Sequence, residues 1–128
     1  MNEPNWLDKE TVLEIHGDVI AATGGSDGLR DEGLLESALA RPHNVFAYEN
    51  VTIFDLAATY AEAIAHNHPF IDGNKRTAFT TADIFLDVNG YRLKADKEEQ
   101  ADIMVDLAEK KISRDDLSSF FSKNSHPI

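Results

Sequence analysis

The stretch that decides how this 128-residue chain folds runs from His66 to Thr77 and reads HNHPFIDGNKRT. Apolar residues recur at helical spacing both before and after it. The part from His66 to Gly73 is therefore expected to form a loop between one helix over residues 52–65 and another over residues 74–88. The second helix carries apolar residues around most of its circumference, which predicts that it lies buried at the centre of the fold.

The same period predicts further helices farther from this stretch. They are expected over residues 8–23, 32–40, 97–110 and 114–123. Pro42 is expected to end the helix over 32–40, because proline lacks the N–H that continues a helix. The segment Asn44–Val51 (NVFAYENV) mixes aromatic and β-favouring residues, so it is expected to form an extended flap or a tiny hairpin.

These elements predict an all-α bundle with a short extended flap, in a single domain covering residues 1–128. The composition agrees, because 42% of the residues are hydrophobic and 27% are charged, as in ordinary globular domains. The chain has no cysteine, which excludes disulfides, thiolate zinc sites and a cysteine nucleophile. It shows neither a secretory signal nor a stretch of about 18 apolar residues, so a soluble, cytoplasmic protein without membrane contact is expected.

Charge is distributed unevenly along the chain. The net charge of −11 arises from 12 basic and 23 acidic residues, and residues 1–64 hold 3 of the basic and 12 of the acidic ones. Nonspecific binding of nucleic acid or of an anionic membrane needs a clustered basic face, so both are disfavoured. Any phosphate chemistry must be local, and Lys75-Arg76 is the best-placed basic pair.

The start of the helix over 74–88 has the features of an anion site. Gly73 allows a tight turn, and the helix that follows offers unpaired N–H groups at the positive end of its dipole. Lys75 and Arg76 add full positive charges and Asn74 adds an amide. Together these groups suit a polyphosphate.

Two neighbouring residues extend this interpretation towards catalysis. The carboxylate of Asp72 would repel phosphate unless a divalent cation bridged the two, and Mg²⁺ is the natural bridge. His68 is a candidate general base, because imidazole titrates near neutral pH and can accept a proton from an attacking hydroxyl.

Simpler interpretations remain open at this stage. A histidine, an aspartate and two cations in one loop are more often solvated side chains and a helix cap than a catalytic site. His66 and His68 together with Asp72 also resemble part of a metal-hydrolase ligand set, although no other histidine has ligand-like spacing. A Walker A phosphate loop is excluded, because its glycine pattern is absent around Lys75.

The order of the residues adds a more specific indication. The stretch resembles the signature of the Fic/Doc (Fido) family, H-x-F-x-D/N-A/G-N-K/G-R. It matches all seven defined positions, which are His68, Phe70, Asp72, Gly73, Asn74, Lys75 and Arg76. The segment Gly28–Pro42 is also similar to the N-terminal part of the Doc, or death-on-curing, toxins. Lys75 is typical of that branch, whereas Fic proteins that transfer AMP usually have glycine there; Pro69 and Gly73 are closer to the Fic version.

This resemblance implies a function. It implies a compact Fido bundle that acts as the toxin of a toxin–antitoxin system and transfers the γ-phosphoryl group of ATP, with Mg²⁺, to a hydroxyl of a host protein. The implied target is a threonine of translation elongation factor Tu, so that translation would stop. Two alternatives remain, namely AMP transfer by the same site and a catalytically silent module that binds an antitoxin.

The resemblance also implies residue roles. His68 would be the general base, Asp72 would orient it or hold Mg²⁺, and Phe70 would anchor the loop in the core. Gly73, Asn74, Lys75 and Arg76 would hold the nucleotide phosphates, with Lys75 also taking part in transfer. The segment Asn44–Val51 would be the family's flap, which docks a target peptide by strand addition.

Inhibition is expected to come from a partner. Many Fic proteins carry an inhibitory S/T-x-x-x-E-G/N helix, but the Glu-Gly/Asn pairs at 32–33 and 49–50 have Gly28 and Val45 where Ser or Thr is required. A separate antitoxin is therefore expected to supply an acidic group towards Arg76 from a segment that folds as a helix on binding.

Overall fold

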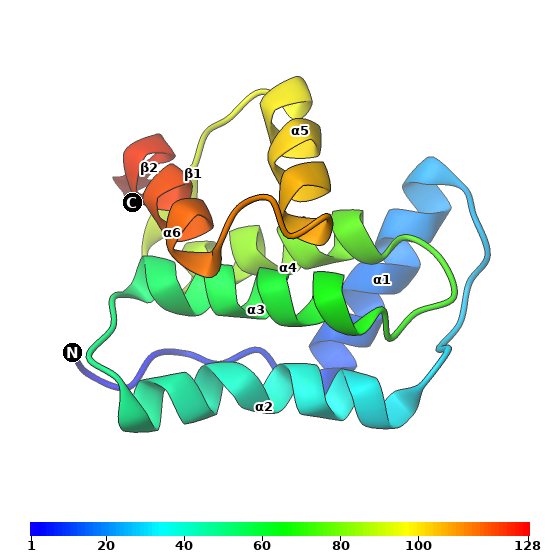
Figure 1. Ribbon diagram of the computed structural model, residues 1–128, viewed down its shortest axis with the longest axis horizontal. Helices are drawn as coiled ribbons and strands as arrows, with labels where there is room; N and C mark the ends of the chain where they lie inside the picture. The colour runs from blue at the N-terminus through cyan, green and yellow to red at the C-terminus, as the bar shows by residue number, and fades with distance from the viewer.

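The computed structural model describes residues 1–128 and contains six α-helices and one two-stranded antiparallel sheet (Figure 1). The helices are α1 (Lys9–Thr23), α2 (Glu32–Tyr48), α3 (Ile53–Asn67), α4 (Asn74–Val88), α5 (Lys97–Ala108) and α6 (Arg114–Asn124). The strands are β1 (Tyr91–Leu93) and β2 (Ser125–Pro127). This architecture confirms the all-α class. No helix has both the length and the apolar character needed to span a membrane.

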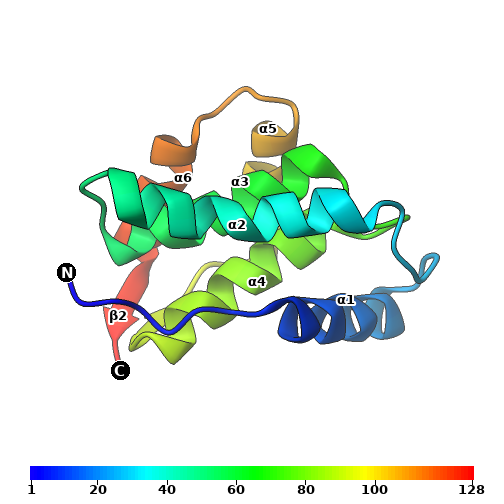
Figure 2. The ribbon, with the colours of Figure 1, turned by 90° about the horizontal axis from the view of Figure 1, so that it is seen from below.

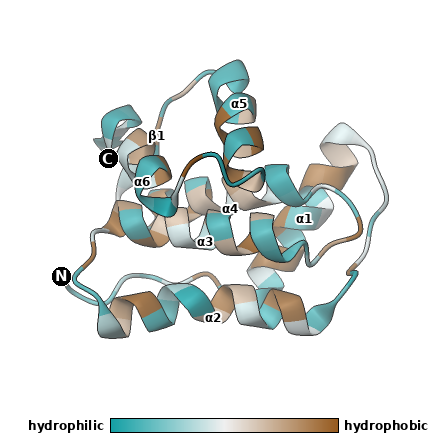
Figure 3. Cartoon of the chain, in the orientation of Figure 1, coloured by the Kyte–Doolittle hydropathy of each residue, from teal (hydrophilic) through white to brown (hydrophobic).

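Helix α3 is the centre of the packing, with α2 along one side and α5 and α6 on another (Figure 1). Its buried positions include five alanines, Ala57, Ala58, Ala61, Ala63 and Ala65. Small side chains at the contacts allow α2, α4 and α6 to approach closely. The outer helices are amphipathic, and hydrophobic and hydrophilic residues alternate along α2 (Figure 3). The α3–α4 pair thus forms a buried frame for the loop that joins its two helices.

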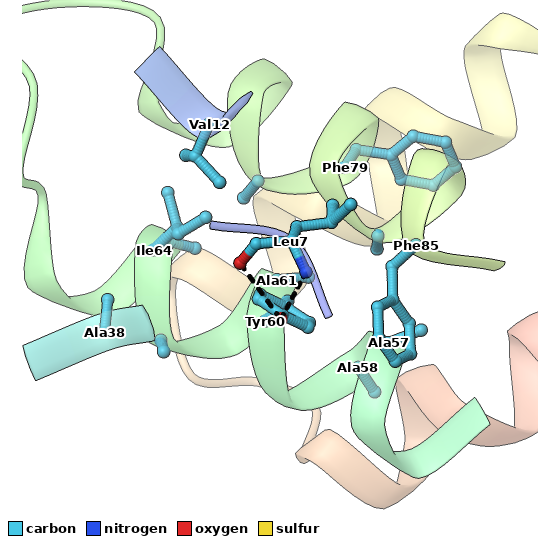
Figure 4. Close-up of a cluster of buried hydrophobic side chains, with 14 of the residues drawn as sticks. Leu7, Val12, Ala38, Ala57, Ala58, Tyr60, Ala61, Ile64, Phe79 and Phe85 are labelled. Carbon is cyan, nitrogen blue, oxygen red and sulfur yellow. Dashed lines mark hydrogen bonds between the residues drawn. The ribbon is translucent and has the colours of Figure 1, made fainter. Parts of the chain in front are cut away.

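Tyr60 connects this frame to the N-terminal segment. Its ring lies 4.9 Å from that of Phe85, and its hydroxyl accepts a hydrogen bond from the Leu7 N–H at 3.1 Å (Figure 4). Burial raises the pKa of Tyr60 to about 12. The N-terminal segment also crosses the end of α4, where the Asn5 N–H donates to Asn89 at 2.7 Å (Figure 2).

The prediction for Asn44–Val51 is wrong, because this segment is not an extended flap. Helix α2 does not end at Ala40 but continues through Pro42 to Tyr48, and the chain leaves the helix only at Glu49. A proline inside a helix removes one backbone hydrogen bond. The packing of the residues that follow must therefore compensate for that loss.

The packing around Trp6 provides the reason. The indole stacks on the ring of His43 at 4.0 Å and meets Phe46 edge-on at 5.5 Å. Val45 and Phe46 also pack against the hydrophobic core. These contacts require the side chains to recur at helical spacing, and they outweigh the β-propensity of the same residues. The helical end of α2 is therefore imposed by tertiary contacts.

The extended segment near the loop lies elsewhere in the chain, at Gly28–Arg30. Leu29 forms an antiparallel bridge with Phe70, and the Ile71 N–H donates to the Gly28 carbonyl at 3.1 Å. The Arg30 N–H donates to the Pro69 carbonyl at 2.8 Å. The sequence of residues 24–30, GGSDGLR, predicts only a turn-rich loop here.

Asp55 joins the start of α3 to α6. Its carboxylate accepts hydrogen bonds from the Thr52 N–H at 2.9 Å and from the Ser118 hydroxyl at 2.6 Å. Burial is the largest single influence and raises the pKa of Asp55, but the hydrogen bonds from Ser118 and Thr52 together outweigh it and hold the pKa below its usual value. A lowered pKa in the folded state stabilises the protein above the unfolded pKa, and that contribution is lost as the pH falls through the folded pKa.

Replacing Asp55 with alanine is expected to lower the free energy of unfolding by about 2 kcal/mol at pH 7, because the variant loses a helix cap and leaves the Ser118 hydroxyl unpaired. Urea denaturation at pH 7 and at acidic pH measures the effect, and the difference from the parent should shrink in acid. Glu10→Ala is the control, since Glu10 is an exposed acidic residue in the first turn of α1. Equal losses for the two variants would contradict the assignment.

Candidate active site

The loop between α3 and α4 begins and ends with left-handed backbone. His68 has φ 50° and ψ 55°, and Gly73 has φ 76°. A positive φ is unusual for a residue with a side chain and needs support from its surroundings. Arg30 provides that support, because its guanidinium donates to the carbonyl of His68 at 2.7 Å and to that of Asn67 at 2.9 Å. The position of His68 thus depends on a residue far from it in the sequence.

The side chain of Asn74 holds the middle of the loop. Its Oδ1 accepts from the Phe70 N–H at 3.0 Å, and its Nδ2 donates to the Phe70 carbonyl at 2.9 Å. Nδ2 also lies 3.5 Å from Nδ1 of His68. Asn74 is buried, so its side-chain amide already has partners. Its contribution to an anion is therefore limited to its backbone N–H.

The predicted site residues meet around one cavity of about 650 Å³. Those that line it are His68, Asp72, Gly73, Asn74, Lys75 and Arg76. The predicted anchor Phe70 lies beneath them and is only 1% exposed. A cavity of this volume lies within the range of small-molecule sites. The structure therefore brings together every residue that the motif singled out.

The start of α4 opens into this cavity without a cap. The other five helices begin with side-chain caps, which are Asp8, Asp31, Thr52, Asp96 and Ser113. Gly73 at the start of α4 provides no such group. Lys75 and Arg76 line the cavity, and neither forms an ion pair with any carboxylate. Free N–H groups and two unpaired cations are thus available to an anion.

The carboxylate of Asp72 is fixed at the edge of the cavity. Oδ1 accepts from the Gly73 N–H at 2.9 Å, and Oδ2 accepts from the Ser26 N–H at 3.3 Å. Gly25 has φ 111°, and a Cβ there would lie 2.7 Å from Oδ2 of Asp72. The left-handed backbone at Gly25 therefore favours glycine, and a side chain there would displace the carboxylate of Asp72.

Asp72 suits Mg²⁺ better than it suits a metal held entirely by protein. Its carboxylate is a hard oxygen ligand, and no group of three His, Cys, Asp or Glu residues could hold a metal ion. Mg²⁺ is usually held by one or two carboxylates together with substrate phosphates and water, so a single carboxylate at the edge of a cavity suited to phosphate fits it. The metal-hydrolase alternative does not fit, because the His66 ring bonds the Leu107 carbonyl at 2.9 Å instead.

One wall of the cavity was not predicted from the sequence. Helix α5 contributes Lys97, Gln100, Met104 and Val105, which add a third cation and an apolar surface. The amphipathic pattern of this segment predicted a helix, but no local signal places that helix opposite the motif. Only the packing of α5 against α3 and α4 brings these residues to the site.

Fold and cavity together define a class of all-helical domains with a cavity at the uncapped start of a central helix. Within that class, the chain belongs to the Fic/DOC family, which it matches over residues 6–86. This family is one of transferases.

Two relatives are similar over most of their length. The chain is 38% identical over 120 residues to the protein named Toxin Doc of Mycolicibacterium smegmatis (strain ATCC 700084 / mc(2)155), covering 89% of this chain and 88% of the relative. It is also 38% identical over 108 residues to Protein kinase doc of Escherichia phage P1, covering 84% and 85% of the two chains. These similarities support a toxin function of Fic/Doc type, and toxins of this kind imply a cognate antitoxin.

A solved structure confirms the fold. It is the N-terminal Fic domain of a putative cell filamentation protein (VirB-translocated Bep effector) from Bartonella quintana, with bound ADP. The TM-score is 0.52 at 20% identity, and the match covers 75% of this chain and 47% of that chain.

Proposed function

We propose that this protein is a Doc-type toxin that transfers the γ-phosphoryl group of ATP to a hydroxyl of a host protein. The observation that carries the proposal is the cavity in which His68 and Asp72 lie beside the uncapped start of α4 and two unpaired cations. Phosphoryl transfer depends mainly on positioning and on neutralising charge, and this cavity is suited to both. The ADP bound to the related Fic domain supports a nucleotide as the ligand.

The nucleotide would bind along the cavity with its phosphates at the start of α4. The backbone N–H groups of the first turn, Lys75 and Arg76 would hold the phosphate oxygens. The apolar side chains of Phe79, Met104 and Val105 offer a surface for the base. When bound at Asp72, Mg²⁺ would neutralise phosphate charge that the carboxylate would otherwise repel.

His68 would take the proton of the acceptor hydroxyl. As the hydroxyl oxygen forms its bond to the γ-phosphorus, the bond between that phosphorus and the bridging oxygen breaks and ADP leaves. The proton moves to the imidazole of His68, which is exposed at the cavity edge. The proposed acceptor is a threonine of translation elongation factor Tu in the cytoplasm, as the Doc resemblance implies, so that modification would arrest translation.

Separate labelling of ATP at the α and γ positions tests this proposal. The purified protein is incubated with Mg²⁺ and either elongation factor Tu or whole lysate, and protein-bound label is measured. Label from the γ position alone is expected. Label from the α position would establish AMP transfer instead. No label from either position would favour a silent antitoxin-binding module.

The second proposed partner is an antitoxin that binds between α1 and α4. A cavity of about 300 Å³ lies there, lined by Ile15, Val19, Ala22 and Ile84 together with Arg76. An amphipathic helix could bury its apolar face in this groove and direct an acid towards Arg76.

If the protein is a toxin with such a partner, its expression alone is expected to stop growth of the native host. Co-expression of the antitoxin should restore growth. Harmless expression would remove most support for this pairing.

Replacing Arg76 with alanine is expected to weaken ATP binding by about 10- to 100-fold, because a charge-assisted contact to phosphate is lost. Isothermal titration with ATP and Mg²⁺ measures the change. Arg92→Ala is the control, since Arg92 is an exposed arginine of β1 outside the cavity. Equal ATP affinity of the parent and Arg76→Ala would remove Arg76 from the site.

A further inference from the structure

His16 is a buried histidine of α1 that the motif does not include. It is only 2% exposed, and it does not line the cavity of the site. Its Nε2 lies 2.8 Å from the backbone carbonyl oxygen of Asp72. Its ring stacks on that of Phe70, with centroids 3.9 Å apart and planes 4° from parallel. His16 therefore contacts the loop at two points, on either side of Ile71.

The contact with Asp72 fixes the direction of the hydrogen bond. A carbonyl oxygen only accepts, so Nε2 of His16 carries a proton and donates it. This carbonyl belongs to the peptide group that joins Asp72 to Gly73. The N–H of the same peptide group donates to Oδ1 of Asp72 at 2.9 Å. By holding the plane of this peptide, His16 orients the N–H that fixes the Asp72 carboxylate.

The stack on Phe70 holds the other side of the loop. Phe70 is 1% exposed, and both polar groups of its backbone bond the side chain of Asn74. The His16 ring therefore packs on a side chain that is itself fixed. Its Nδ1 lies 3.6 Å from the carboxylate of Asp27, in the exposed segment that also supplies the Ser26 N–H to Asp72. His16 thus lies where α1, this segment and the loop meet.

We infer that His16 is a positioning residue for the transfer reaction, which acts through the Asp72 peptide to place the Asp72 carboxylate. This inference rests on the proposed function. The positioning role depends on the N–H group at Nε2 of His16, so an aromatic ring of similar size without a donor should not replace it. It also predicts an effect on turnover and not on phosphate affinity, because His16 contacts neither Lys75 nor Arg76.

Three substitutions separate the hydrogen bond from packing. His16→Gln keeps a donor at the place of Nε2, because the glutamine side-chain amide nitrogen matches that atom in distance from the backbone. His16→Asn places its amide nitrogen at Nδ1 instead, and His16→Phe keeps the stack without any donor. His43→Phe is the matched control, since His43 also stacks on an aromatic ring, that of Trp6, outside the site.

Two readouts are measured on the intact protein. The first is kcat and KM for γ-label transfer, where His16→Phe and His16→Asn should lower kcat by about 30- to 100-fold with little change in KM for ATP. The second is the amide proton chemical shifts of Ser26 and Gly73, the two N–H donors to Asp72, which should move in the same two variants. His16→Gln should restore both readouts to near parental values, and His43→Phe should change neither.

Either of two results would overturn the inference. One is a parental kcat and parental amide shifts in His16→Phe, and the other is a His16→Gln variant as impaired as His16→Asn. The amide shifts need no turnover, so they test the positioning role even if the parent transfers no label. An inactive parent whose amide shifts follow the expected pattern would refute the proposed function and leave the placement of Asp72 by His16 supported.

Discussion

Replacing His68 with alanine is expected to lower the rate of γ-phosphoryl transfer by about 100- to 10,000-fold, because the reaction loses its general base. The melting temperature should stay close to that of the parent, since the His68 side chain is exposed and has no partner closer than the 3.5 Å contact with Asn74. ATP affinity should also be retained. Rates of label transfer, thermal unfolding and ATP titration measure the three quantities.

His126→Ala is the matched control for this experiment. His126 lies in β2, is exposed, and is outside the cavity, so its loss should change none of the three quantities. A variant without His68 that labels substrate at the parental rate would show that another group takes the proton.

Replacing Lys75 with glycine is expected to reduce γ-label transfer by about 100-fold or more, because the ammonium no longer neutralises the transferring group. By the resemblance to the family, glycine at this position leaves room for the α- and β-phosphates against the helix start, so that the α-phosphorus faces the hydroxyl. Lysine would fill that space, so that the γ-phosphorus faces the hydroxyl in place of the α-phosphorus. Transfer of α label is the expected new activity, and it requires the rest of the cavity to accept the reversed nucleotide.

Lys75→Ala separates the side chain from the backbone in this test. Glycine loosens the first turn of α4 and also removes the charge, whereas alanine only removes the side chain. Both variants should lose γ transfer, and only Lys75→Gly should gain α transfer. A parent that already transfers α label, with an unchanged pattern in Lys75→Gly, would exclude the kinase assignment in favour of AMP transfer.

The loop and its two helices were predictable because their signals are local. Apolar residues at helical spacing identify α3 and α4, and glycine marks the turn between them. The end of α2 was not predictable, since Val45 and Phe46 favour strands by propensity and become helical only through their packing on the core. The β1–β2 pair was missed as well, because each strand is three residues long and the pairing joins distant segments.

The sequence predicted which motif residues form the candidate site, but not the contacts that hold them in place. The motif identified the cations and the histidine, but it assigned the Asn74 amide to phosphate, whereas the structure shows that amide bonded to Phe70. Lys97 of α5 and Arg30 before α2 carry no local sign that they reach the loop. Long-range packing alone reveals both roles, because the two residues come from opposite sides of the motif in the sequence.

The backbone conformation at Gly25 bears on how genes for this protein become inactive during evolution. A Cβ there would lie 2.7 Å from Oδ2 of Asp72, so a single base change outside the motif is expected to displace this carboxylate and lower activity. Cells that escape a harmful gene product keep whatever mutation silences it. Inactive descendants of this gene can therefore keep the residues from His68 to Arg76 unchanged. The motif by itself does not distinguish an active toxin from such an inactive descendant.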